Sequence, residues 1–308
     1  MTAVGNTFFF GWEVSLMQWL QANLSDAAMR ILSAFSFLGE ELLLVFLLGF
    51  LYWSLNKELG KRVGLNLLMI NVWFPMVKNV ALRRRPYLDH EGIGLKRLID
   101  PSAPAEDIAA QGYSFPSGHS ANAVGMYGSL AAVFRKGWLT AAAIVLPLLV
   151  GISRVAVGAH YPTDVIAGWA VGGLIVLLLP KLRKAVRNPY VFYGILLATA
   201  LPGVFYCRSA DYFSGLGLLI GFVAGAVVEE KYVRFQDTRK PLSMALRLIG
   251  GGVIYLALNT LLKLPFPRSF LDSGTYGALF VRCARYAVIA FVDFALYPML
   301  FAKVRVLN

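Results

Sequence analysis

Residues 153–179 read SRVAVGAHYPTDVIAGWAVGGLIVLLL, and this stretch decides the fold class. Its first part carries an arginine, a histidine and an aspartate, whereas residues 165–179 contain no charged side chain. An apolar run of about 20 residues is long enough to cross the roughly 30 Å of hydrocarbon in a bilayer as a helix. The stretch therefore predicts a polar segment with titratable side chains at the end of a membrane span.

The same apolar character extends along all 308 residues. The chain is 58% hydrophobic and only 15% charged, whereas a soluble domain carries about 25% charged residues. A transmembrane β-barrel would instead alternate apolar and polar residues in pieces of about 10 residues, and no such alternation occurs. We therefore predict an all-α, polytopic transmembrane helical bundle. The nine predicted spans are 40–55, 63–82, 117–134, 138–156, 162–180, 189–206, 213–229, 243–262 and 277–301.

The spans suggest three parts of the chain. Residues 40–185 form the predicted catalytic core and residues 186–308 a four-span extension. Residues 1–39 are less apolar. Trp12, Leu16, Trp19 and Leu20 recur there at helical spacing, which is typical of an amphipathic helix in the membrane interface. A short tenth span at 24–39 is the competing interpretation, and it leaves the predicted side of the motifs unchanged.

The chain has a net charge of +12, and its basic residues are unevenly distributed along the sequence. If nine spans alternate, many of the lysines and arginines fall in loops on one side of the membrane, which the positive-inside rule makes cytoplasmic. This pattern favours an orientation signal over a nucleic-acid partner, which we do not expect. The C-terminus is then cytoplasmic, and the polar motifs open on the extracytoplasmic side, periplasmic or lumenal. The loops concerned lie at 57–62, 135–136, 181–187, 231–240 and 303–305.

Three polar stretches lie at the ends of predicted spans on that same face. They read KNVALRRRP (78–86), YSFPSGHS (113–120) and SRVAVGAHYPTD (153–164). A membrane interior tolerates such residues where they have partners and a function. Together the stretches predict one site. The candidate site residues are Lys78, Arg85, Ser117, Gly118, His119, Arg154, His160 and Asp164.

In the first stretch, Lys78 and Arg85 are seven residues apart, so a continuous helix would place both on one stripe. Two cations on one stripe call for an anion or for carboxylates to offset them. Arg83 and Arg84 fall on other faces of such a helix and are interpreted as snorkelling to the membrane surface. The long linker that follows, about 86–116, is interpreted as a lid or substrate-selecting loop.

The other two stretches supply the groups for phosphoryl chemistry. Ser117 is a predicted helix cap, and the free N–H groups near Gly118 can bind an anion. His119 then lies where an imidazole could deliver a proton. His160 and Asp164 are four residues apart at a helix start, so the carboxylate could hold Nδ1 of the ring and stabilise the imidazolium. Singly, each motif also fits a structural cap; jointly they indicate a phosphate site.

With these three stretches the sequence resembles the type 2 phosphatidic acid phosphatase superfamily. The family pattern is Lys, six residues, Arg-Pro; then Pro-Ser-Gly-His; then Ser-Arg, five residues, His, three residues, Asp. The resemblance covers about residues 40–185 and implies a six-helix-type core. It also implies that His160 is a nucleophile forming a phosphohistidine, that Asp164 orients it, and that His119 is the general acid. The phosphate-binding residues it implies are Lys78, Arg85, Ser117, Gly118 and Arg154.

The resemblance implies a metal-independent phosphatase without a cofactor, acting on phosphorylated lipids at the extracytoplasmic face. Suitable substrates are phosphatidate, phosphatidylglycerol phosphate, polyprenyl diphosphate and sphingoid phosphate. A hydrolase of a soluble sugar phosphate, similar in layout to glucose-6-phosphatase, and a lipid phosphotransferase remain open alternatives. A lipid transporter is the non-enzymatic alternative. The sequence does not predict the oligomeric state.

Polar residues outside the motifs receive structural interpretations. His90 is expected to be a solvated loop histidine. Arg247 and Asp293, in the last two predicted spans, are expected to form an interhelical pair. Cys207 and Cys283 have no metal-ligand spacing and are expected to pack in the interior, with a disulfide left open.

Overall fold

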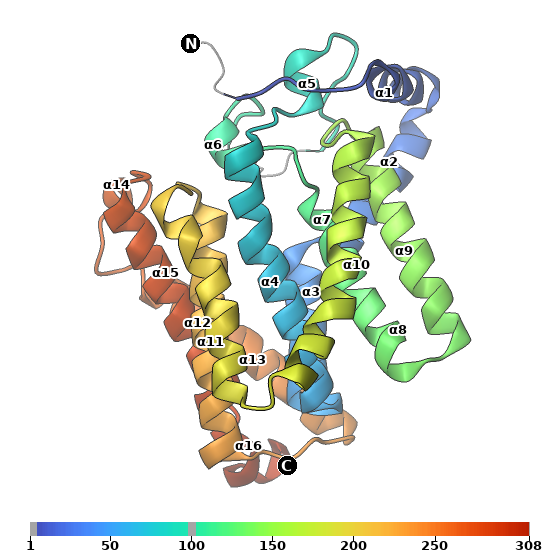
Figure 1. Ribbon diagram of the computed structural model, residues 1–308. Helices are drawn as coiled ribbons and strands as arrows, with labels where there is room; N and C mark the ends of the chain where they lie inside the picture. Colours follow the sequence, from blue (N-terminus) through green and yellow to red (C-terminus); the bar gives the residue numbers. More distant parts are fainter. Residues whose placement is uncertain (1–4, 98–102, 308) are drawn as a thin grey trace. The chain divides into compact units, whose positions relative to one another are not determined.

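The computed structural model describes residues 5–97 and 103–307, and helices are their regular elements (Figure 1). Within those ranges, the only β-type pairing is an isolated parallel bridge between Asn6 and Arg83. The predicted all-α class is therefore confirmed.

The chain divides into two compact units. Unit 1 consists of Met1–Leu44 and Phe74–Leu178, and unit 2 of Val45–Trp73 and Leu179–Asn308. All three polar motifs lie in unit 1, and the predicted C-terminal extension lies in unit 2. The chain runs between the units within α3 (Glu41–Phe50), α4 (Lys57–Ala81) and α10 (Pro162–Ala185).

The other helices of unit 1 are α1 (Gly11–Asn23), α2 (Asp26–Phe35), η1 (Ser36–Gly39), α5 (Pro86–Asp89), α6 (Ile108–Gln111), α7 (Gly118–Ala123), the π-helical η3 (Val124–Gly128), α8 (Ser129–Phe134) and α9 (Gly137–Ala156). Those of unit 2 are η2 (Leu51–Leu55), α11 (Pro189–Ala200), η4 (Leu201–Phe205), α12 (Ala210–Val228), η5 (Glu229–Val233), α13 (Pro241–Leu261), α14 (Arg268–Leu271), α15 (Tyr276–Phe291), η6 (Val292–Leu296), α16 (Met299–Lys303) and η7 (Arg305–Leu307).

Each predicted span coincides with a helix or a run of helices, of which only the run under 277–301 is broken, by turn residues 297–298. The predicted number of nine is not confirmed. In the described part of the chain, five helices are long and apolar enough to cross a membrane, or six if Asp26–Gly39 and Glu41–Leu55 together form one bent span. The rest are shorter or interrupted by π-helical turns. The five are Lys57–Ala81, Gly137–Ala156, Pro162–Ala185, Ala210–Val233 and Pro241–Leu261.

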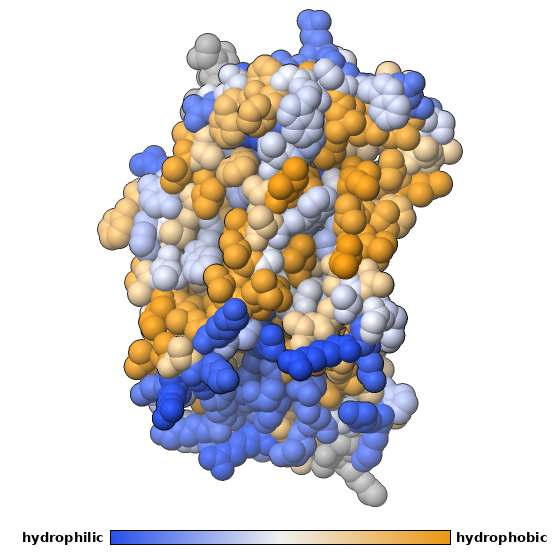
Figure 2. Space-filling view, turned by 45° about the vertical axis from the view of Figure 1, so that its right-hand side comes forward, coloured by the Kyte–Doolittle hydropathy of each residue, from blue (hydrophilic) through white to orange (hydrophobic). Residues whose placement is uncertain are grey.

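The long helices expose apolar faces, as a surface in contact with lipid requires. On α9, Ile144, Val145, Leu148 and Ile152 recur at helical spacing, and each is more than 40% exposed. Figure 2 shows hydrophobic residues over much of the visible surface, with hydrophilic residues densest toward the bottom of the view and others at its top. A large exposed apolar surface is unfavourable in water. The chain is thus an integral membrane protein with several spans.

In unit 1, small residues let α10 approach α7 closely. A Cβ built on Gly168 would lie 2.6 Å from the carbonyl oxygen of Ser117, and one on Gly172 would lie 2.9 Å from that of Ala121. Glycines four residues apart allow this kind of close helix contact in membranes. The contact holds the second and third motifs together.

Replacing Gly168 by alanine is therefore expected to lower the free energy of unfolding by about 1–3 kcal/mol, because the methyl group would push the Ser117 backbone away. The matched control is Gly173→Ala on the same helix, where an added Cβ meets no atom within 4 Å. That change should stabilise α10 by up to about 1 kcal/mol. Thermal unfolding of the detergent-purified variants measures both, and equal effects would contradict the predicted close contact.

In unit 2, α12 and α15 pack through glycines in the same way. A Cβ on Gly217 would lie 2.2 Å from the carbonyl oxygen of Cys283, and one on Gly221 would lie 2.1 Å from that of Ala287. Cys207 and Cys283 are both buried and free, so the expectation that they pack in the interior is confirmed.

The expected pair between Arg247 and Asp293 is wrong. Arg247 donates to the carbonyl oxygens of Trp53 (2.5 Å) and Gln236 (3.0 Å), and its guanidinium lies 4.2 Å from the ring centroid of Phe301. Backbone carbonyls at the ends of helices provide acceptors that the sequence does not reveal, and these satisfy the guanidinium instead.

Candidate active site

The first motif does not continue as a helix. α4 ends at Ala81, and Leu82 adopts a left-handed conformation with a φ of 50°. Arg85 is extended, as expected for a residue before proline. The interpretation that Lys78 and Arg85 share one helical stripe is therefore wrong: Lys78 lies in the last turn of α4, and Arg85 reaches the site from the chain that follows.

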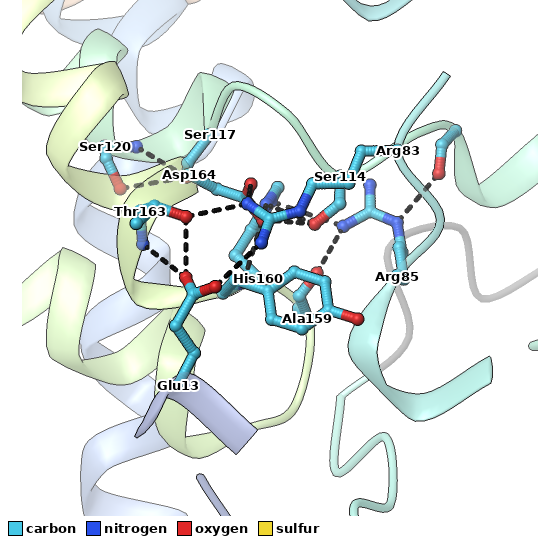
Figure 3. A network of polar contacts seen from close by, with 12 residues as sticks. Glu13, Arg83, Arg85, Ser114, Ser117, Ser120, Ala159, His160, Thr163 and Asp164 are labelled. Carbon is cyan, nitrogen blue, oxygen red and sulfur yellow. Dashed lines mark hydrogen bonds and ion pairs between the residues drawn. The ribbon is translucent and has the colours of Figure 1, made fainter. Parts of the chain in front are cut away.

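Backbone carbonyls hold the Arg85 guanidinium beside His160. Its Nε and Nη2 atoms donate to the carbonyl oxygens of Gln111 and Gly112, at 2.7 to 3.1 Å. Its Nη1 atom donates to the carbonyl oxygen of Ala159 at 2.8 Å and lies 3.3 Å from Nε2 of His160 (Figure 3). Arg85 is 2% exposed. A cation is therefore fixed next to the ring nitrogen that points away from Asp164.

The structure brings His160 and Asp164 together. Nδ1 of His160 lies 3.5 Å from Oδ2 of Asp164. The Ser114 hydroxyl donates to the same Oδ2 atom and lies 3.5 Å from Nδ1, and the backbone N–H of Tyr161 donates to Oδ2 at 2.8 Å. Ser114 is completely buried. The sequence analysis missed Ser114, because a serine in a turn carries no signal of its own.

The second motif forms a capped helix start. The Ser117 hydroxyl accepts from the backbone N–H of Ser120 at 3.4 Å, as predicted for a cap of α7. Around Gly118 the space is open, with no atom within 4 Å of the position that a Cβ would take. His119 is half-buried and lies within electrostatic reach of His160. The open side of the helix start thus leaves room for a small anion.

Arg154 is a buried cation with unsatisfied hydrogen-bond donors. It is 1% exposed, and its Nη1 atom donates to the hydroxyl of Ser36 at 3.1 Å. Its Nε and Nη2 atoms are buried and have no hydrogen-bond partner in the described structure. Buried charges normally have partners, since desolvating an unpaired cation is costly. The guanidinium therefore calls for an anion.

Burial lowers the pKa of His160 well below its usual value of 6.5, and the positive charges of Arg85, Lys78 and Arg154 lower it further. A neutral imidazole is thereby favoured at neutral pH, with a lone pair available on one ring nitrogen.

The acid limb of kcat/KM is accordingly expected below pH 6.5, because activity needs neutral His160 and protonation occurs only at lower pH. The same shift makes the folded state lose stability as pH falls through 6.5, since the unfolded chain then binds the additional proton. Rate profiles from pH 4 to 8, with the substrate's own ionisation followed by phosphorus NMR, measure the limb. An enzyme limb at or above pH 6.5 would contradict the prediction.

The interpretation of Arg83 as a snorkelling residue is wrong. Arg83 is 1% exposed and forms ion pairs with Asp164 and with Glu13 of α1. Two signals in the sequence pointed to this network. Arg85 precedes a proline, so the helix could not continue to it, and Glu13 is an isolated acid in an aromatic, apolar segment. Arg84 is half-buried and pairs with Asp89.

The interpretation of His90 as a solvated histidine is also wrong. The His90 ring is half-buried, and its centroid lies 4.5 Å from the centroid of the Phe9 ring. Its Nε2 atom lies 2.9 Å from the hydroxyl of Tyr161. In the linker 86–116, α5 and α6 are formed, whereas residues 98–102 lie outside the described structure. A lid function of the linker stays a prediction. Across residues 5–97 and 103–307, no group of three His, Cys, Asp or Glu side chains is placed to hold a metal ion.

Comparison with known proteins gives two family matches. Residues 44–187 match the model of the PAP2 superfamily, and residues 213–308 match that of the PAP2 superfamily phosphatase, transmembrane extension. No solved structure matches significantly.

Curated relatives match over part of their length. A phosphatidylglycerophosphatase B of Bacillus subtilis is 36% identical over 30% of this chain and 52% of its own. A lipid A 4'-phosphatase of Bacteroides thetaiotaomicron is 33% identical over 26% of this chain and 39% of its own. An undecaprenyl-diphosphatase of Sulfolobus acidocaldarius is 27% identical over 44% of this chain and 60% of its own. The chain thus spans about 39 to 60% of the length of these relatives.

Proposed function

Since the chain belongs to the PAP2 superfamily, we propose that it is a membrane phosphatase that hydrolyses lipid phosphate monoesters or diphosphates through a phosphohistidine on His160. The observation that carries the proposal is the buried Arg154 guanidinium, two of whose nitrogens lack partners. Phosphoryl oxygens carry negative charge and can accept hydrogen bonds from both of these nitrogens.

In the first step, Nε2 of His160 attacks phosphorus, and the bond from phosphorus to the leaving oxygen breaks. His119 donates a proton to that oxygen. Lys78, Arg85 and Arg154, with the Ser117 side chain and the Gly118 amide, bind the phosphoryl oxygens. Positioning and charge stabilisation are the main requirements of phosphoryl transfer. Since these cations lie within electrostatic reach of His160, they supply the positive charge that a metal ion provides elsewhere.

In the second step, His119 takes a proton from water, which attacks phosphorus and releases inorganic phosphate from Nε2 of His160. Asp164 faces Nδ1 of His160 in both steps. Its negative charge stabilises the positive charge that the ring carries as a phosphohistidine. The distance of 3.5 Å between Nδ1 and Oδ2 is long for a hydrogen bond, and contacts of this kind tighten when the substrate binds.

A lipid substrate is supported by the position of the motifs at the ends of apolar helices and by the relatives, whose names specify lipid A, phosphatidylglycerophosphate and undecaprenyl diphosphate. The extracytoplasmic side is supported by Arg135 and Lys136, at the opposite end of α9 from Arg154. Twenty helical residues are about 30 Å long, the thickness of the hydrocarbon layer. Labelling of cysteines introduced at Lys136 and Glu106 with a membrane-impermeant maleimide in intact cells tests the side, and only the second should react.

The function is tested with purified full-length protein in mixed micelles. The substrates are phosphatidate, phosphatidylglycerol phosphate, undecaprenyl diphosphate, a sphingoid phosphate, lipid A and glucose 6-phosphate, with EDTA present throughout. Release of phosphate from one or more lipids is expected, with glucose 6-phosphate at least about 10²-fold poorer because it lacks the apolar binding energy. With substrates that are radiolabelled in the phosphate group, transfer of the label to an added lipid acceptor instead of to water would indicate a phosphotransferase. Release from glucose 6-phosphate alone, or from no compound, would contradict a lipid phosphatase.

A further inference from the structure

The guanidinium of Arg83 lies over two aromatic rings. Its guanidinium carbon lies 3.9 Å from the ring centroid of Tyr161 and 4.6 Å from that of Phe8. Its backbone pairs with Asn6: the Asn6 N–H donates to the carbonyl oxygen of Leu82, and the Arg84 N–H donates to that of Asn6. These contacts fix the position of the guanidinium inside unit 1.

The guanidinium joins two carboxylates. Nη1 of Arg83 donates to Oδ1 of Asp164 at 2.6 Å and Nη2 donates to Oε2 of Glu13 at 2.9 Å, while Nε donates to the carbonyl oxygen of Phe8 at 2.9 Å (Figure 3). The acceptors of Arg83 thus lie in two segments that are far apart in the chain, the N-terminal residues 8–13 and the first turn of α10. Because Oδ1 of Asp164 is anchored in this way, Oδ2 faces the ring of His160.

Both oxygens of Glu13 are engaged. Oε1 accepts from the N–H (3.0 Å) and the hydroxyl (2.6 Å) of Thr163, the residue before Asp164. Oε2 accepts from Arg83 and from the backbone N–H of Phe10 at 2.8 Å. Glu13 is completely buried. One carboxylate therefore connects α1 to Arg83 and to the first turn of α10.

We propose that Glu13 and Arg83 are positioning residues of the site: Glu13 holds Arg83, and Arg83 holds the Asp164 carboxylate in the rotamer that orients His160. This inference rests on the proposed role of His160 as the nucleophile. Two carboxylates share one guanidinium, so the three buried groups carry one net negative charge. That charge faces the imidazole and stabilises the ring once Nε2 bears a phosphoryl group.

Measurements of ligand binding can distinguish a loss of the His160 orientation from a general collapse of the site. Orthovanadate bonds to an oriented imidazole nitrogen and mimics the transition state, whereas inorganic phosphate needs only the cations. Titration calorimetry on folded, full-length protein in detergent measures both dissociation constants for Arg83→Gln, Arg83→Lys, Glu13→Gln and the double variant Glu13→Gln/Arg83→Gln. Arg84→Gln is the matched control, and His160→Ala identifies the vanadate that is bound through the histidine.

Arg83→Gln is expected to weaken vanadate binding by about 10²-fold and phosphate binding by less than about 3-fold, the size of effect that outer groups exert on the groups they orient. Glu13→Gln should weaken vanadate binding by about 10-fold in the wild-type background. In the Arg83→Gln background it should add less than about 2-fold, because residues that act through one another are not additive. Arg83→Lys should recover part of the loss, and Arg84→Gln should bind like wild type.

Two results would overturn the proposal: vanadate affinity within about 3-fold of wild type in folded Arg83→Gln, or vanadate and phosphate weakened by the same factor. If Arg83→Gln does not fold, Arg83→Lys and Glu13→Gln decide by the same two criteria. A protein that hydrolyses no substrate but still loses vanadate selectively in these variants would refute the proposed phosphatase activity and support the positioning role.

Discussion

Replacing His160 by alanine is expected to abolish phosphate release, with a loss of at least about 10³-fold, since the variant has no group to take the phosphoryl. Wild-type protein that is incubated with radiolabelled lipid phosphate and then denatured should carry a covalently bound label. The label should be lost in acid and kept in base, because a phosphohistidine is labile in acid and stable in base. The variant should show none. Turnover and label per folded molecule are the measurements.

His90→Ala is the matched control for that experiment. Among the three histidines of the chain, His90 is half-buried and bonded to the hydroxyl of Tyr161, with no contact to Asp164. We expect it to keep turnover within about 10-fold of wild type, since it removes one hydrogen bond and some packing but no group that is proposed to bind or attack the substrate. Retained turnover in His160→Ala, or a labelled protein without His160, would remove the assigned nucleophile.

Replacing Arg154 by methionine is expected to lower activity and raise stability at the same time. Turnover should fall by about 10²–10³-fold, the usual cost of losing one donor to the transition state. The free energy of unfolding without ligand should rise by about 1–3 kcal/mol, because a desolvated cation with one hydrogen-bond partner is replaced by an apolar chain of similar length. Kinetics and thermal unfolding on the same preparation measure the two effects.

Arg247→Met provides the opposite control. Arg247 is also 1% exposed, but it donates to the carbonyl oxygens of Trp53, Gln236 and Leu307. Its loss leaves these acceptors unpaired, so stability should fall while turnover per folded molecule stays unchanged. If both arginine variants lose stability, Arg154 has partners that the structure does not show, and the argument for an anion beside it fails.

The buried arginines of the two units differ in how completely their donors are satisfied. In unit 2, Nε and Nη1 of Arg247 donate to backbone carbonyl oxygens of three separate segments. In unit 1, Arg85 is fixed by carbonyl oxygens and Arg154 by one serine hydroxyl. Cations that are held in place but incompletely neutralised are preorganised for charge that develops in a transition state.

Several features followed from the sequence because they depend on local patterns. Apolar runs predicted the helices, and each predicted span coincides with a helix or a run of helices. Ser117 caps α7, as predicted. His160 and Asp164, four residues apart, lie within reach of each other. Where the prediction failed locally, the proline after Arg85 already contained the signal that the helix could not continue.

Other features depended on contacts between residues far apart in the chain. Arg83 is 70 residues from Glu13 and 81 from Asp164, so no spacing rule could identify it as the residue between two carboxylates. The number of spans also stayed open, because π-helical turns and short helices interrupt apolar runs that look continuous in the sequence.

The sequence by itself determined that this protein is helical, embedded in a membrane and equipped with histidines, cations and one acid at the ends of its spans. Periodicity and motif spacing are properties of short segments, and they survive without knowledge of the fold. Only the tertiary structure decided which cations are neutralised and which are left for a ligand. That distinction depends on where backbone carbonyls and distant carboxylates lie in three dimensions, and desolvation makes each such partner decisive.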